Sequence, residues 1–165
     1  YADAVRCYER AGYTKSAVRC LARQVELDAQ PAQAAQWYER AGMYADAARC
    51  YELAGDTKSA AHCLAKQAEQ EGQPAQAAQW FEQAGMTLEA ASCYEQAGRY
   101  ADAGRCYEQA GRYASAGRCY EDSGRYADAG PCYEQAGLYL CASRCYELAG
   151  LVAAATRCRK LARQW

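Results

Sequence analysis

Alanine, cysteine and tyrosine recur along this chain with a period of 13 residues. The pattern is clearest in residues 100–138, which read YADAGRCYEQAGR, YASAGRCYEDSGR and YADAGPCYEQAGL in succession. In the first copy, Ala103, Cys106, Tyr107 and Ala110 stand at positions i, i+3, i+4 and i+7. This spacing places the four residues on one face of an α-helix and the charged residues on the other. Each unit is therefore predicted to be one short helix followed by its turn.

The same unit extends over the whole chain when it is aligned on the cysteine position, which we call the anchor. The twelve anchors are Cys7, Cys20, Trp37, Cys50, Cys63, Trp80, Cys93, Cys106, Cys119, Cys132, Cys145 and Cys158. Their spacing is 13 residues, except for 17 residues from Cys20 to Trp37 and from Cys63 to Trp80. Four extra residues make roughly one helical turn of about 3.6 residues. We therefore predict that the second and fifth helices are one turn longer than the others.

Helix boundaries repeat with the same regularity. Glycine follows the last small residue of nine units, at Gly12, Gly42, Gly55, Gly85, Gly98, Gly111, Gly124, Gly137 and Gly150. A glycine there is typical of a left-handed C-terminal cap. Pro31 and Pro74 stand at the first helical position, where a missing N–H costs nothing. Helices of about ten residues are unstable alone, so their stability must come from stacking on neighbours.

The expected fold is all-α: a single domain over residues 1–165, formed by an α-solenoid of about twelve short antiparallel helices in 13-residue units. Residues 1–43 and 44–86 form two copies of a three-helix repeat, and residues 87–165 follow the uniform period. The chain starts in phase with the repeat, so we expect it to be a fragment of a longer array.

The small and aromatic positions carry a family resemblance. Ala4, Tyr8 and Ala11, like Ala103, Tyr107 and Ala110, resemble the second helix of a tetratricopeptide repeat. The phrase AGRYADAGRCYEQAG is similar to the helical arrays of soluble NSF attachment proteins and of intraflagellar-transport and coat subunits. The resemblance implies a right-handed solenoid. The helix pair here spans 26 residues, in contrast to about 34 in the tetratricopeptide repeat.

The charge pattern argues against polyanionic partners. Nineteen basic and twenty acidic residues give a net charge of −1, too little for broad attraction to nucleic acid or anionic membranes. An arginine precedes the anchor in seven units, at Arg6, Arg19, Arg49, Arg105, Arg118, Arg144 and Arg157. Aspartate three residues before and glutamate three residues after predict ion pairs within each helix. No apolar run approaches the roughly 20 residues needed to span a bilayer, so we expect neither nucleic acid nor membrane as a partner.

Ten of the eleven cysteines occupy anchors, which indicates core packing in a reducing, cytoplasmic setting. Cys141 lies off this row and forms an i, i+4 pair with Cys145, so the pair is a candidate metal or redox site. His62, the single histidine, replaces an arginine of the column, and we assign it no catalytic role.

Several other substitutions depart from the repeat. Trp37 and Trp80 replace cysteine in the helices that follow the long ones. They either cover the extra surface of the long helix or bind a partner protein through their aromatic rings. Gly104, Gly117 and Gly130 stand where earlier units have alanine or valine, which predicts closer helix packing after residue 99. Pro131 lies inside its helix and predicts a kink or a loosened first turn.

No catalytic constellation is present in the sequence, and we expect neither an enzyme nor a cofactor. The function that the pattern favours is a non-catalytic scaffold for protein–protein interaction within a larger multidomain protein. A structural spacer or sensor arm that positions a catalytic domain elsewhere is one alternative, and a thiol-based metal or redox protein is another. Uncapped ends also predict end-to-end self-association of the isolated segment.

Overall fold

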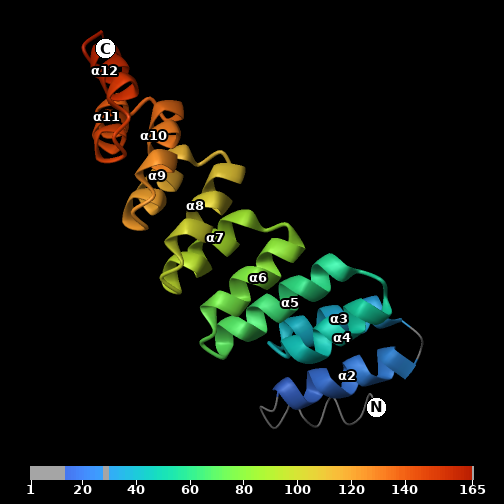
Figure 1. Cartoon of the computed structure of the whole chain (residues 1–165). Coiled ribbons are helices and arrows are strands. Elements are labelled where there is room, and N and C mark those ends of the chain that lie inside the picture. The colour runs from blue at the N-terminus through green and yellow to red at the C-terminus, as the bar shows by residue number, and fades with distance from the viewer. Residues whose placement is uncertain (1–13, 28–29, 165) are drawn as a thin grey trace. The chain divides into compact units, whose positions relative to one another are not determined.

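A computed structural model describes residues 14–27 and 30–164, and this part of the chain is helical without a strand. Eleven helices are described, and the first predicted helix, around Cys7, lies outside the described residues. The chain divides into two compact units, Tyr1–Gly85 and Met86–Trp165. In each unit, consecutive helices pack side by side, which is the neighbour-to-neighbour arrangement of an α-solenoid (Figure 1).

The first unit contains the two long helices. Its described helices are α2 (Thr14–Leu27), α3 (Pro31–Arg40), α4 (Tyr44–Leu53), α5 (Thr57–Gln70) and α6 (Pro74–Ala84). Helices α2 and α5 have 14 residues each, whereas α3 and α4 have 10. The predicted extra turn is therefore confirmed for both helices, and Pro31 and Pro74 are the first residues of α3 and α6, as predicted.

The second unit repeats helices of nearly constant length. They are α7 (Thr87–Gln96), α8 (Tyr100–Gln109), α9 (Tyr113–Asp122), α10 (Tyr126–Gln135), α11 (Tyr139–Leu148) and α12 (Val152–Ala162). Pro131 does not shorten α10, which has 10 residues like its neighbours. The backbone N–H of Ala129 still bonds to the Arg125 carbonyl at 3.0 Å. The expectation of a loosened first turn is thus wrong, whereas the alternative, a kink, stays a prediction; Pro131 itself is exposed.

The helix ends show how the turns are closed. After α4, Gly55 has a φ of 78° and donates its N–H to the Glu52 carbonyl at 3.0 Å. Asp56 donates to the Tyr51 carbonyl at 2.9 Å, which completes a Schellman motif. Left-handed glycine recurs at the predicted positions in the described residues, and also at Gly72, which the repeat alignment did not identify. Gly12 lies outside the described residues.

The core consists of alanine, cysteine and tyrosine from the predicted helix face. Cys106, Cys119 and Cys145 are completely buried, as expected for packing residues. Phe81 takes the tyrosine position of α6 and is completely buried as well. Because alanine and cysteine are small, helix axes can approach closely and still exclude water. Among the described residues, no helix combines the length and apolarity that a membrane span requires.

The helical glycines of the second unit make room for tyrosine rings. A Cβ atom at Gly104 would lie 2.9 Å from the ring of Tyr120, and one at Gly117 would lie 2.9 Å from the ring of Tyr133. Tyr120 is 5% exposed, whereas Tyr107, which follows Ala91 at the same spacing of 16 residues, is only half-buried. Tyr51, however, follows Ala35 at the same spacing and is 8% exposed, so the glycine leaves room beside the tyrosine ring without being required for its burial. The predicted change in helix packing angle stays a prediction.

We expect Gly130→Ala to destabilise the protein, although alanine is the better helix former by about 1 kcal/mol. The new Cβ would lie 2.5 Å from Cε1 of Tyr146, and overpacking of this kind costs about 1–3 kcal/mol. Urea unfolding followed by circular dichroism measures the net effect. A second change, Tyr146→Leu, should recover part of the loss, because Ala48 and Leu64 share one core cluster at the same spacing in the first unit. A more stable Gly130→Ala single variant would contradict this account.

Candidate functional site

One glutamate carboxylate joins three consecutive helices in the second unit. Glu95, at the end of α7, accepts a hydrogen bond from the Tyr107 hydroxyl of α8 at 2.6 Å on Oε2. Its Oε1 accepts from Arg118 Nη2 at 2.7 Å and from Cys119 Sγ at 3.5 Å, both on α9. The partners follow the glutamate by 12, 23 and 24 residues. We call this set of four side chains the carboxylate network.

The carboxylate network recurs along the second unit. Glu121 accepts from Tyr133 at 3.0 Å and from Arg144 at 2.6 Å. Glu134 accepts from Arg157 at 2.6 Å, and the Cys158 thiol donates to the same oxygen at 2.8 Å. Each network therefore connects a helix to the next one and to the one after that.

These contacts correct the predicted pairing of the arginine column. Arg118, Arg144 and Arg157 do not pair with the glutamate three residues later but with one 23 residues earlier. The reason lies in the tertiary structure. The glutamate at the C-terminal end of one helix lies beside the anchor of the second helix after it. The predicted i, i+3 pairing with aspartate is confirmed for Arg49 with Asp46 and for Arg105 with Asp102, both at 3.8 Å.

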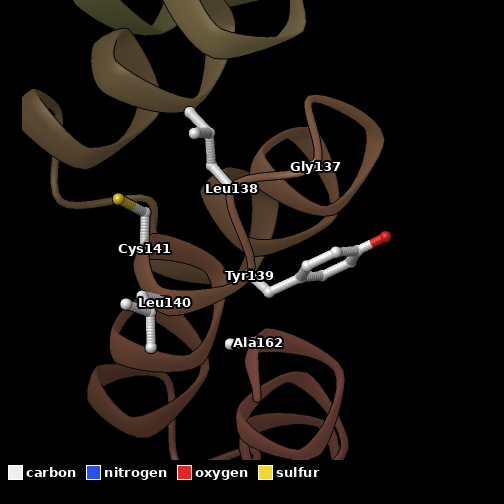
Figure 2. Close-up of a pocket in the computed structure, with 6 residues that line it drawn as sticks. All are labelled: Gly137, Leu138, Tyr139, Leu140, Cys141 and Ala162. Carbon is white, nitrogen blue, oxygen red and sulfur yellow. The ribbon is translucent and has the colours of Figure 1, made fainter. Parts of the chain in front are cut away.

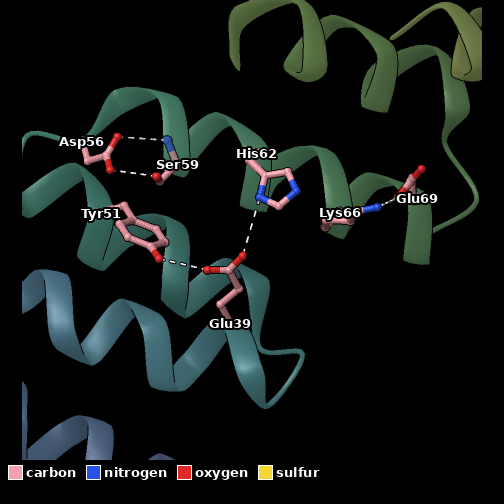
Figure 3. Close-up of polar contacts among 7 residues, drawn as sticks. All are labelled: Glu39, Tyr51, Asp56, Ser59, His62, Lys66 and Glu69. Atoms are coloured by element: carbon pink, nitrogen blue, oxygen red, sulfur yellow. Dashed lines mark hydrogen bonds and ion pairs between the residues drawn. The ribbon is translucent and has the colours of Figure 1, made fainter. Parts of the chain in front are cut away.

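At two other glutamates, Glu108 and Glu39, the same arrangement occurs with a different residue at the arginine position. Tyr120 donates to Glu108 at 3.0 Å, and the arginine position of that network is Pro131. In the first unit, Tyr51 donates to Glu39 at 2.9 Å, and the arginine position is His62. The Nδ1 atom of His62 lies 3.6 Å from Oε1 of Glu39 (Figure 3).

His62 and Cys63 thus lie beside a carboxylate that the sequence analysis did not connect with them. One potential ligand atom from each of Glu39, His62 and Cys63 lies within 4.8 Å of the other two. Glu39 precedes Tyr51 by 12 residues and His62 by 23 residues. The same offsets recur in other units, and they could have identified Glu39 from the sequence.

Burial keeps the inner groups of these networks protonated. It raises the pKa of the Cys63 thiol to about 12, and the Glu39 carboxylate adds to this shift. Burial likewise raises the pKa of Cys119 and of the Tyr107 hydroxyl to about 12, with Glu95 adding to both shifts. At neutral pH these groups therefore keep their protons, and Tyr107 and Cys119 donate hydrogen bonds to the Glu95 carboxylate. A buried neutral thiol is a poor nucleophile, and the hydrogen bonds of the networks link neighbouring helices of the stack.

The predicted thiol pair lies on α11. Cys145 is completely buried, and burial raises the pKa of its thiol to about 11. Cys141 is half-buried. In the part of the chain that the structure describes, the cluster of three potential metal ligands is Glu39, His62 and Cys63, and it contains neither thiol of this pair. A metal or redox role for Cys141 and Cys145 stays a prediction.

The two tryptophans of the anchor row are half-buried. Trp37 packs against the core cluster around Ala34 and Tyr38. The guanidinium of Arg40 lies 5.5 Å from the centre of its ring, within the range of a cation–π contact. This position agrees with the covering role considered for Trp37, and a partner-binding role for Trp37 and Trp80 stays a prediction.

An apolar surface lies at the start of α11. A cavity of about 320 Å³ is lined by Gly137, Leu138, Tyr139, Leu140, Cys141 and Ala162. Figure 2 shows the residues from 137 to 141 around the first turn of α11, with Ala162 contributed by the end of α12. Leu140 is 70% exposed and Leu138 is 42% exposed. Among the described residues, five of the eight exposed large hydrophobic side chains lie between Leu138 and Val152.

Comparison with known families agrees with this architecture. The tetratricopeptide repeat family matches residues 110–136. The aromatic-di-alanine repeat family matches residues 4–14, 34–45, 47–57, 77–88, 90–101, 103–114 and 142–150. Neither the curated proteins nor the solved structures provide a match. The family matches and the packing of short helices together define a tetratricopeptide-like helical-repeat protein.

We expect Cys141 to react quickly with Ellman's reagent in the folded protein, because it is half-buried and lines an open cavity. Cys145 should react only on unfolding, since it is buried and its pKa is raised. Cys141→Ser should remove one thiol from the fast phase, and Cys145→Ser should leave that phase unchanged. The opposite result would show that the packing of α11 is different.

Acid should weaken the carboxylate network around Glu134. Burial raises the pKa of Glu134, but hydrogen bonds from Cys158 and Arg157 outweigh this effect and leave the pKa below its usual value. Stability from this group is present above the pKa of unfolded glutamate and is lost as the pH falls below about 5. Melting temperatures between neutral and acidic pH should show a smaller pH dependence for Glu134→Gln than for the wild type. Glu108→Gln is the matched control, because Pro131 supplies no guanidinium there.

Proposed function

We propose that this protein is a non-catalytic scaffold that binds another protein through its helical array. Helical repeats of the matched families generally serve this role. The observation that supports the proposal most is the apolar surface around the start of α11. Leu138 and Leu140 remain exposed there, beside a cavity of about 320 Å³. Exposed apolar side chains gathered in one place mark interaction sites on soluble proteins.

The occupant that fits this surface is an apolar segment of a partner protein. None of the six residues that line the cavity is charged, so a charged ligand would lose hydration without gaining an ion pair. Leucine or aromatic side chains of a partner would instead bury apolar area on both sides, at about 25 cal/mol per Å².

The surface charges support a protein partner over a polyanion. The guanidinium groups of Arg118, Arg144 and Arg157 are each within 2.7 Å of a glutamate oxygen. Binding to phosphates would require these arginines to exchange one anion for another. As part of the same proposal, the scaffold belongs to a larger multidomain protein in the cytoplasm. A reducing compartment suits the buried thiols of Cys63, Cys119 and Cys132, which form no disulfide.

Selection from a phage-displayed library of random peptides tests the apolar surface. We expect enrichment of uncharged peptides rich in leucine or aromatic residues, with binding weakened at least about tenfold by Leu140→Glu. Leu53→Glu is the matched control, since Leu53 is also 70% exposed but belongs to the first unit. Binding should survive that change.

Two results would contradict the proposal. The first is a library that yields no peptide, or peptides that bind equally well to the Leu140→Glu variant. The second is self-association of the chain in sedimentation that Leu140→Glu abolishes, since a second copy would then be the occupant of this surface. Self-association that is unaffected by Leu140→Glu leaves the surface available and supports the assignment to a partner.

A further inference from the structure

We propose that Glu39, His62 and Cys63 form a binding site for a divalent cation of the zinc class. Glu39 comes from the end of α3, and His62 and Cys63 are consecutive residues of α5. Carboxylate oxygen, imidazole nitrogen and thiolate sulfur are the three ligand types that Zn²⁺ accepts in proteins. The set arises from one substitution in the arginine column, His62 in place of arginine.

Comparison with the second unit shows what this substitution changes. In the network of Glu95, the Arg118 guanidinium contributes a permanent positive charge at 2.7 Å from the carboxylate. A guanidinium has no lone pair to offer a metal, whereas a neutral imidazole has one. His62 therefore replaces a cation with a metal ligand, next to the same carboxylate and the same thiol. A bound metal ion would restore the positive charge that arginine supplies in the other unit.

The distances suit a metal after small side-chain movements. Nδ1 of His62 lies 3.6 Å from Glu39 Oε1, and the three potential ligand atoms lie within 4.8 Å of one another. Ligand bonds of about 2.0–2.3 Å in a tetrahedral site place neighbouring ligand atoms roughly 3–4 Å apart. Small rotamer changes among the three side chains would bring their ligand atoms into this range.

The surroundings support the site as well. The Tyr51 hydroxyl donates to Oε2 of Glu39 at 2.9 Å, which orients the carboxylate and leaves Oε1 directed at His62 (Figure 3). Such an outer hydrogen bond on a ligating carboxylate is a regular feature of metal sites. On the same helix as His62, the Lys66 ammonium pairs with Glu69 at 2.9 Å.

Access from solvent is also present. The side chains of His62 and Glu39 are 29% and 33% exposed, whereas Cys63 is completely buried behind them. The metal would thus enter from the surface, with water as the fourth ligand. On binding, the Cys63 thiol releases its proton to solvent and the sulfur bonds to the metal as thiolate. The site would cross-link α3 and α5 in the first unit, and its role would be structural or regulatory.

Titration with Co²⁺ under reducing conditions tests the site, because thiolate coordination produces a charge-transfer band in the near ultraviolet. We expect the band in the wild type and its competitive loss on addition of Zn²⁺. His62→Arg restores the residue of the column and should weaken cobalt binding at least about tenfold while the helical circular dichroism is kept. Glu39→Gln should weaken binding too. Cys63→Ala should abolish the band, and where that variant unfolds, His62→Arg decides the question alone.

The control is a substitution that should create a second metal site of the same kind in the second unit. Arg118→His places an imidazole between Glu95 and Cys119, the same side-chain set as in the first unit, and we expect it to add a second cobalt equivalent. Zinc should also raise the melting temperature of the wild type and not that of His62→Arg. No cobalt band in the wild type, or a band that is unchanged in His62→Arg because other cysteines bind the metal, would overturn the proposal.

Discussion

The structure depends on the inability of its helices to exist alone. Most have only 10 or 11 residues, and an isolated helix of that length is marginal in water. Each must bury its alanine, cysteine and tyrosine face against its neighbours. Small side chains permit this close packing, and in the second unit three helical glycines leave room beside the next tyrosine ring. The turn glycines then set the spacing at which helices can follow one another.

The carboxylate networks add a second, polar connection to this apolar packing. One glutamate receives a tyrosine from the next helix and an arginine from the helix after it, as Glu121 does with Tyr133 and Arg144. Tyrosine therefore serves two purposes, with its ring in the core and its hydroxyl on the carboxylate. Because the geometry repeats, a single substitution at the arginine position changes the chemistry without changing the fold. Proline leaves no guanidinium beside Glu108, and histidine beside Glu39 brings three potential metal ligands together.

The repeat pattern predicted the helices more successfully than the sites. The long α2 and α5, the first residues of α3 and α6, and the glycine caps all followed from local rules that act within a few residues. The pairing of Arg144 with Glu121 did not, because local spacing offered an equally good glutamate three residues further on. The apolar surface at Leu138 and Leu140 was not predicted either. A leucine in a helical repeat is normally expected in the core, and only the structure shows that these two are exposed.

The sequence by itself determined the helical repeat, its two longer helices and its alanine, cysteine and tyrosine core, because periodicity and capping are properties of neighbouring residues. Only the tertiary structure decided which side chains meet across 12 and 23 residues. That meeting depends on how each helix lies against the two that follow it. His62 shows the difference most clearly, because in the sequence it is one exception in a column of arginines. In the folded chain it lies close to a carboxylate and a buried thiol.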